Sequence, residues 1–279
     1  MTSVRRPAVA GSWYPGSAGA LEAAVERHLA TAARGVDGDL VALVAPHAGL
    51  MYSGPVAAHA YRLLRDRTFD VAVLVGPSHF VAFEGVAVST DDFDTPLGAA
   101  AVDRACADAL MRADPVVHAD RAPHAREHSL EMQLPFLGRL VPGLPIVPLV
   151  MGYQTPDTAF GLGDALARAL RGRKALVIAS TDLSHYHDAA TAARLDAAVI
   201  ECVEQFDAEA LQDALNRNHE HACGGGPTVA VMRAARLAGA RDAIVLNYAD
   251  SGDVSGDKSA VVGYLAAALG NFARAERGH

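Results

Sequence analysis

Short, uninterrupted runs of apolar residues that end abruptly in polar side chains are the main pattern along this chain. The clearest is residues 71–75, all apolar, which a Gly-Pro-Ser turn connects to His79. Residues 40–45 and 175–179 show the same pattern. Continuous apolar runs of this length are typical of strands buried on both faces in a parallel sheet. The pattern therefore predicts strands that carry polar residues at their carboxyl ends.

Apolar residues at four-residue spacing form a second pattern, which predicts helices between the strands. Leu21, Val25 and Leu29 make such a stripe in the segment 18–33. Strands that alternate with helices are typical of an α/β fold. The expected strands are residues 40–45, 71–75, 85–89, 145–151, 175–179 and 242–248. The expected helices are residues 18–33, 53–67, 99–112, 157–171, 189–206, 208–216 and 228–238, and a final apolar element is expected at 259–269.

No internal repeat, linker or low-complexity segment divides the chain. We therefore expect a single α/β domain over residues 1–279, with a central, mostly parallel or mixed sheet flanked by helices.

Ser53 is a plausible cap for the second helix. The turn-rich residues 7–17, which include the sole tryptophan, are expected to fold back onto the body, and the tail 271–279 is expected to fray.

Composition narrows the possible partners and the location. The chain has 279 residues, about half of them hydrophobic (51%), and a net charge of −8 with acidic and basic residues interspersed. It has no basic patch for nucleic acid, no polybasic segment for a membrane surface and no apolar run long enough to span a membrane. Three scattered cysteines do not form a disulfide framework. These features predict a cytoplasmic protein that contacts neither nucleic acid nor membrane.

Four residues share the context of a strand end or a glycine turn: His47, His79, His185 and Cys223. Ligands of open α/β sheets bind outside the carboxyl ends of the strands, so these side chains are expected in one pocket. Imidazole and thiolate together suit iron, copper or zinc. Three protein ligands with one open position would indicate a catalytic rather than a structural metal site.

Two acidic segments leave alternatives open. Asp182 could orient a histidine, bind a metal directly, or form an Asx turn or helix cap. Glu127 and Glu131 have helical spacing that would place them on one face, either as metal ligands or as a solvated surface. The HExxH motif of zinc proteases is absent, because Glu131 and Met132 follow where its second histidine would stand.

The chain resembles a known family in ordered motifs that span nearly its whole length. These motifs are Ala10-Gly-Ser-Trp13-Tyr14-Pro15, Pro46-His47-Ala-Gly49, Gly76-Pro77-Ser78-His79, Glu127-His128-Ser-Leu-Glu131-Met-Gln-Leu-Pro135, Ser180-Thr-Asp182-Leu-Ser-His185, Cys223-Gly224 and Tyr248-Ala-Asp-Ser251-Gly252. Together they resemble the Memo family, whose bacterial members are described as protein B of the AmmeMemoRadiSam system. The fold of that family is similar to that of class III extradiol ring-cleavage dioxygenases, which are non-haem Fe(II) enzymes.

The resemblance implies a site in the expected pocket. Its metal ligands would be His47, His79 and Cys223, with His185 in the place of the dioxygenase acid/base histidine. Separately from the resemblance, we expect Asp182 to act with His185 as a catalytic residue, and Trp13, Tyr52 and His128 to line the substrate pocket. The dioxygenases use a carboxylate as third ligand, and a cysteine there shifts metal preference towards copper or zinc unless Glu127 or Asp182 also faces the metal.

Three functions follow as hypotheses. The first is a non-haem Fe(II) or copper dependent redox protein with a dioxygenase-like cleft, in which His185 exchanges a proton with substrate. The second is a module that binds a peptide or small ligand in the same cleft without turnover. The third is a zinc-dependent hydrolase with metal-bound water as nucleophile. Family context also implies a radical SAM protein as a partner.

Overall fold

The computed structural model describes residues 3–33 and 36–273 of the chain. Its strands are β1 (Val4–Arg5), β2 (Gly38–Ala45), β3 (Val71–Pro77), β4 (Val86–Val88), β5 (Asp92–Phe93), β6 (Val117–Ala119), β7 (Ile146–Met151), β8 (Ala175–Ser180), β9 (His185–His187), β10 (Asp242–Asp250) and β11 (Val261–Phe272). Its α-helices are α1 (Ala18–Thr31), α2 (Leu50–Tyr61), α3 (Arg104–Ala113), α4 (Leu134–Leu140), α5 (Pro156–Ala169), α6 (Ala189–Glu204), α7 (Ala208–Arg217), α8 (Gly225–Leu237) and α9 (Gly252–Ser255). Three short 3₁₀ segments complete it: η1 (Arg62–Leu64), η2 (Glu131–Gln133) and η3 (His219–His221).

One mixed sheet organises the described part of the chain. Its strand order is β10-β11-β2-β8-β3-β7-β4-β6, and β9 pairs with β11 as a ninth strand. The central strands β2, β8, β3 and β7 are mutually parallel, whereas β11 is antiparallel to β2 and β4 is antiparallel to β7. This arrangement confirms the predicted α/β class with a mostly parallel or mixed sheet.

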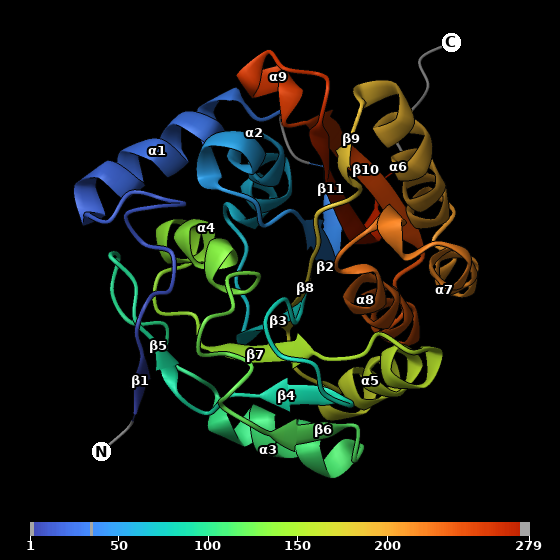
Figure 1. The fold of residues 1–279 in the computed structure, drawn as a ribbon. Helices are drawn as coiled ribbons and strands as arrows, with labels where there is room; N and C mark the ends of the chain where they lie inside the picture. The colour runs from blue at the N-terminus through green and yellow to red at the C-terminus, as the bar shows by residue number, and fades with distance from the viewer. Residues whose placement is uncertain (1–2, 34–35, 274–279) are drawn as a thin grey trace.

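Helices cover both faces of the sheet, which explains why the central strands are apolar without interruption. Successive side chains of β3 point to opposite faces. Val71, Val73 and Val75 pack in a core with residues of α3, α5, α6, α7 and α8. Ala72 and Leu74 pack in a second core with residues of α1, α2 and α4. Figure 1 shows the same division, with α1, α2 and α4 on one side and α5 to α8 on the other.

Three helices, α2, α3 and α8, begin three or more residues from their predicted starts, and α8 begins at Gly225 rather than at residue 228. α2 begins at Leu50 with Gly49 as its N-cap residue, so the expectation that Ser53 caps it is wrong. The Ser53 hydroxyl instead donates to the carbonyl oxygen of Ala48. α3 begins at Arg104, later than the predicted residue 99, because Asp103 caps it by accepting from a backbone N–H of the first turn.

The predicted helical face of Glu127 and Glu131 is also wrong. Residues 127–130 are not helical, and the helical segment begins only at η2, which contains Glu131. Close approach explains the irregular path. A Cβ at Gly76 of β3 would lie 2.7 Å from Ser129 Oγ, so glycine allows this segment to cross the end of the strand. The two glutamates therefore serve different parts of the structure.

The carboxyl-terminal apolar element is the long strand β11. It lies between β10 and β2, and its residue Asn271, predicted to fray, pairs with Asp39. The rest of the tail, residues 274–279, lies outside the described residues. Within residues 3–33 and 36–273, no helix combines the length and apolar character needed to cross a membrane.

Candidate metal centre

Three predicted ligand residues meet at the carboxyl ends of the central strands. His47 follows β2, His79 follows β3, and Cys223 precedes α8. Each offers one ligand atom, and these three atoms lie within 4.8 Å of one another. The Cys223 sulfur is 3.3 Å from Nε2 of His47, and the two histidine ring centres are 5.2 Å apart. Side chains far apart in sequence thus form one compact donor set.

Hydrogen bonds around His47 determine which ring nitrogen is free. Its Nδ1 lies 2.9 Å from the hydroxyl oxygen of Ser180. The Ser180 hydroxyl donates its proton to the carbonyl of Ser129 at 2.6 Å and accepts from the Gln133 amide at 2.7 Å. Because that hydroxyl proton is already used, we assign the proton between His47 and Ser180 to Nδ1 of His47. Nε2 then presents its lone pair towards Cys223, as a metal ligand requires.

Glu127 fixes the second histidine in the same way. The Nδ1 of His79 donates to Oε1 of Glu127 at 2.9 Å, and the backbone N–H of His79 donates to Oε2 at 2.7 Å. The backbone N–H groups of His128 and Ser129 also donate to Oε1. Burial alone would raise the pKa of Glu127, but these donors, His79 foremost, lower it to about 2. The side chain is therefore a charged partner of His79.

Glu127, His79 and His128 form a second group whose ligand atoms lie within 4.8 Å of one another. In that group both carboxylate oxygens of Glu127 already accept hydrogen bonds. In the set of His47, His79 and Cys223, the sulfur accepts only a weak contact from the backbone N–H of Asp182 at 3.4 Å, and the ring nitrogens nearest to it are not held by a carboxylate. This set is the better fit for a metal, with Glu127 as a hydrogen-bond partner that orients a ligand.

The turn before α8 places the cysteine. Gly224 packs so closely on the end of β8 that a Cβ there would overlap the carbonyl oxygen of Ser180 and lie 2.8 Å from Thr181 Cβ. Its N–H donates to the Thr181 hydroxyl at 3.0 Å. Burial raises the pKa of the Cys223 thiol well above its ordinary value. The thiol therefore stays protonated at neutral pH unless a cation replaces the proton.

Asp182 holds the turn that carries His47. Its Oδ1 accepts the backbone N–H of His47 at 2.8 Å and that of Ala48 at 3.3 Å. Burial raises the pKa of Asp182 to about 7, although these two hydrogen bonds lower it. These contacts reach a distant turn, so they are neither the Asx turn nor the helix cap that the sequence left open. A catalytic role for Asp182 stays a prediction.

Aromatic side chains line one side of the centre. The His128 ring stacks on that of His79 at 4.5 Å and lies 4.4 Å from the Trp13 ring. Phe80 lies edge-on to His128 at 6.0 Å. Trp13 and Tyr52 are each more than a third exposed, and Tyr52 lies in the first turn of α2. Trp13 and His128 thus lie together beside the centre, and Tyr52 lies on the helix that follows His47.

Glu131 anchors the segment that carries Trp13. It is fully buried and pairs with Arg5 at 2.7 Å. It also accepts the Tyr14 hydroxyl at 2.7 Å and the backbone N–H groups of residues 8–9. The lead-in therefore folds back onto the body, as predicted, because one buried carboxylate collects its donors.

His185 begins β9, opposite Val262 of β11. It is partly buried, and it belongs to neither group of candidate ligand atoms found among the described residues. Burial foremost lowers the pKa of His185 itself. A neutral imidazole at neutral pH can accept a proton.

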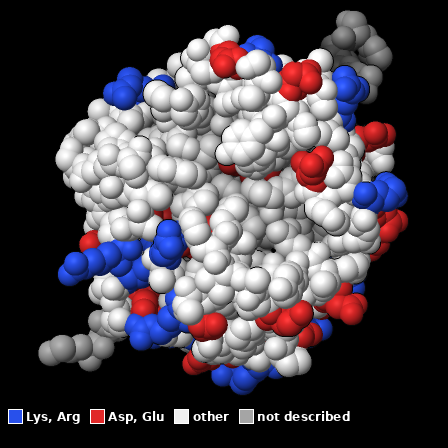
Figure 2. Space-filling model, in the orientation of Figure 1, with Lys and Arg blue, Asp and Glu red and all other residues white. Residues whose placement is uncertain are grey.

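The outer surface beside the centre is hollowed and carries few charged side chains. Figure 2 shows that the middle of this face carries few charged side chains, which gather towards its edges. A cavity of about 350 Å³ borders Cys223 between the end of β7, α7 and the start of α8. Its lining includes Tyr153, Gln154 and Asn216 and contains no Lys, Arg, Asp or Glu. Of the three candidate ligand residues, Cys223 alone lines this space.

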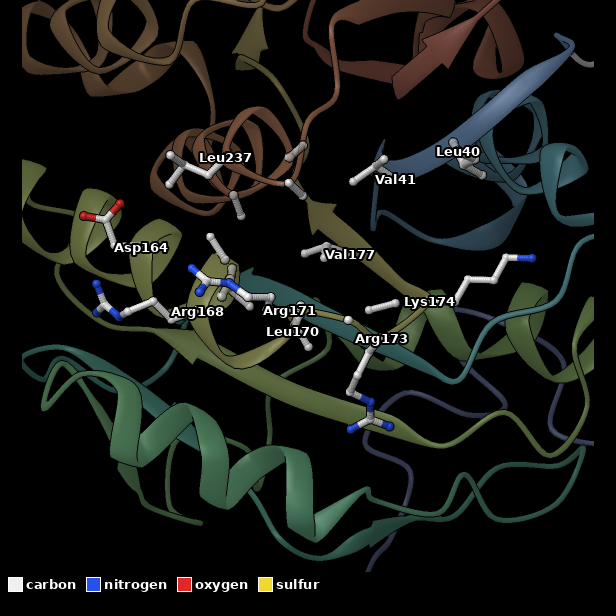
Figure 3. A pocket seen from close by; sticks show the side chains of 17 residues that line it. Leu40, Val41, Asp164, Arg168, Leu170, Arg171, Arg173, Lys174, Val177 and Leu237 are labelled. Atoms are coloured by element: carbon white, nitrogen blue, oxygen red, sulfur yellow. The ribbon is translucent and has the colours of Figure 1, made fainter.

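Another cavity, of about 560 Å³, lies at the amino ends of β2 and β8, and its lining includes neither histidine nor cysteine. Figure 3 shows Arg168, Arg173 and Lys174 diverging from it rather than pointing to a common centre. Arg168 pairs with Asp114 and Arg173 with Asp103. This cavity therefore lacks the convergent groups of a catalytic site.

Sequence reasoning missed the residues that support the ligands. Ser180 is the first polar residue after the apolar run 175–179, so its position at a strand end was a usable signal. Gln133 gave no such signal, because it stands between Met132 and Leu134 with no strand end beside it. Its role depends on three-dimensional contacts alone.

Fold and site together define an α/β protein with two histidines and one cysteine clustered at the carboxyl ends of parallel strands. A sequence profile of the Memo-like protein family matches residues 5–268. The chain belongs to this family. It is 41% identical to a MEMO1 family protein of Methanosarcina mazei, over 94% of this chain and 98% of the relative. It is 37% identical to one of Methanocaldococcus jannaschii, over 96% and 99%.

A solved structure supports the fold alone. An uncharacterized protein from Escherichia coli K12 superposes with a TM-score of 0.54 and 18% sequence identity. The alignment covers 81% of this chain and 99% of that one.

Proposed function

We propose that this protein is a metal-dependent redox protein in which His47, His79 and Cys223 hold Fe(II) or copper. The observation that carries the proposal is the convergence of their three ligand atoms within 4.8 Å, with both histidines oriented by hydrogen bonds at Nδ1. Bound there with an open position, such a metal would supply electron transfer or oxygen chemistry. Zinc also accepts this donor set.

The remaining residues act on the ligand in the cleft. His185, neutral at neutral pH, accepts a proton from a bound small molecule. Asp182 keeps the turn of His47 in place through two backbone hydrogen bonds. Trp13, Tyr52 and His128 provide aromatic surface on which an unsaturated ligand can pack. The uncharged cavity beside Cys223 favours a neutral substrate.

A second candidate is a binding module that holds a peptide or small ligand without turnover. It is favoured by the exposure of the aromatic residues around His128, since Trp13 is 39% and Phe80 50% exposed. Partly exposed aromatic side chains are typical anchors at recognition surfaces.

Metal content tests the donor set. Protein purified without oxygen and loaded with Fe(II) or Cu(I) should bind about one equivalent, as expected of one three-ligand site. His47→Ala and Cys223→Ser should each abolish binding. Matched controls are His59→Ala on α2 and Cys202→Ser on α6, which should retain full binding. Unchanged metal content in His47→Ala and Cys223→Ser would reject the site.

Oxygen uptake separates the functions. The fully loaded iron protein should consume oxygen with at least one member of a catechol panel, and His185→Gln should slow uptake while leaving metal content unchanged. No uptake by fully loaded protein would reject dioxygenase-like chemistry. Turnover of an ester or amide by the zinc form would instead favour the hydrolase.

A further inference from the structure

Behind His185 lies a buried carboxylate that the proposed chemistry does not use. Asp196 of α6 is fully buried, yet no Lys, Arg or His of the described residues lies within ion-pair distance of it. A buried charge is costly unless hydrogen bonds or an opposite charge compensate it. The position of this carboxylate therefore calls for a functional explanation.

The contacts of Asp196 converge on the strand that begins with His185. Oδ1 accepts the backbone N–H of Ser184, the residue before His185, at 2.9 Å. Oδ2 accepts the hydroxyl of Tyr248 on β10 at 2.8 Å. One carboxylate thus ties α6 and β10 to the start of β9.

A glycine on β11 allows this approach. A Cβ at Gly263 would overlap Oδ2 of Asp196 and lie 2.7 Å from its carboxyl carbon. Gly263 follows Val262, which is the pairing partner of His185 in the sheet. The backbone N–H of Gly263 donates to the carbonyl of Ser184 at 3.0 Å. Asp196 therefore lies directly beneath the His185 position.

The groups that face His185 carry opposing charges. Burial and the neighbouring charge of His79 lower the pKa of His185, whereas the carbonyl of Leu183 and the charge of Asp196 raise it. The Tyr186 ring lies edge-on at 5.7 Å. Among these groups, Asp196 is the one acid.

We propose that Asp196 is a positioning residue for His185: it fixes the strand start through Ser184 and stabilises the protonated imidazole. The inference rests on the proposed proton exchange at His185, which it deepens. In this arrangement the proton that His185 accepts from a ligand is balanced by a carboxylate shielded from water, and Tyr248 keeps that carboxylate oriented.

Proton titration of His185 by NMR tests the inference without any turnover. In Asp196→Asn the His185 pKa should fall by about 1 unit, as expected for loss of one nearby opposite charge. The matched control is Asp188→Asn, which removes the same charge from an exposed position before the same helix and keeps a competent cap. The control should leave the His185 titration unchanged. Equal titration curves in Asp196→Asn and the parent protein would overturn the proposal.

A reciprocal measurement keeps the test decisive if Asp196→Asn does not fold. Coupling between two sites is mutual, so His185→Gln must raise the pKa of Asp196 by as much as Asp196→Asn lowers that of His185. The carboxyl carbon of Asp196 reports this shift in ¹³C spectra. An Asp196 titration that is identical with and without His185 would refute the coupling. Metal content and oxygen uptake do not enter either measurement, so failure here is distinct from failure of the redox proposal.

Discussion

Glu127 accepts the Nδ1–H of His79 at 2.9 Å, so the Nε2 of His79 is the nitrogen left free towards His47 and Cys223. A carboxylate behind a histidine ligand raises its basicity and fixes its orientation. In the sequence Glu127 resembles a metal ligand, but in the structure it is the hydrogen-bond partner of a candidate ligand, His79.

Glu127→Gln should therefore weaken metal binding without abolishing it. We expect an affinity loss of about 10- to 100-fold, the usual effect of removing such a partner. Competition titration against a chelator of known affinity measures it. Glu84→Gln, an exposed change in the loop that follows His79, is the control and should bind like the parent. Complete loss of metal in Glu127→Gln would instead indicate a direct ligand.

Removing Glu131 should detach the lead-in that carries Trp13. Glu131→Ala leaves Arg5 buried without its partner, so we expect a loss of about 3–5 kcal/mol in the free energy of unfolding. Fluorescence of the sole tryptophan should shift to the red as Trp13 becomes solvated. Glu26→Ala, which breaks exposed ion pairs with Arg65 and Arg139, should cost less than about 1 kcal/mol and leave the emission unchanged.

Acid should destabilise the protein through His124. Its side chain is 2% exposed, and burial foremost lowers its pKa to about 4. The unfolded chain, with an ordinary pKa of 6.5, therefore binds the proton more tightly, and stability is lost as the pH falls from about 6.5 to about 4. Urea unfolding at both pH values measures the loss. His124→Gln should reduce it by about 3 kcal/mol, and an unchanged loss would contradict this origin.

Gly224→Ala should damage both stability and the metal centre. The new Cβ would overlap the carbonyl oxygen of Ser180 and push the Cys223 turn off the end of β8. We expect a loss of about 2 kcal/mol or more, in the range of overpacked sites, together with weaker metal binding. Gly161→Ala is the control, because a Cβ there lies 3.7 Å from its nearest neighbour and should stabilise α5 by about 0.5–1 kcal/mol.

The fold was largely predictable because its central strands must be apolar on both faces. A strand covered by helices on both faces needs an apolar side chain at every position. Residues 71–75 have this pattern, and the structure buries all of them. The start of α2 was not predictable to the residue, since Ser53 and Gly49 both suit a helix start and tertiary contacts decide between them.

The candidate donor set was also predictable from the strands, because the carboxyl ends of parallel strands lie at one edge of the sheet. The sequence did not show which way each acidic side chain points. Glu127 and Glu131 have the same spacing as residues on one helical face, but the chain there is irregular, so one carboxylate faces His79 and the other Arg5. This irregular segment passes so close to Gly76 that a Cβ there would lie 2.7 Å from Ser129 Oγ.

The contact between His47 and Cys223 spans 176 positions of the chain. The ribosome therefore completes both histidines long before it adds the thiol. The three donor atoms come together only after β2, β3 and the start of α8 have packed, so the complete donor set that we propose for a metal belongs to the folded chain alone.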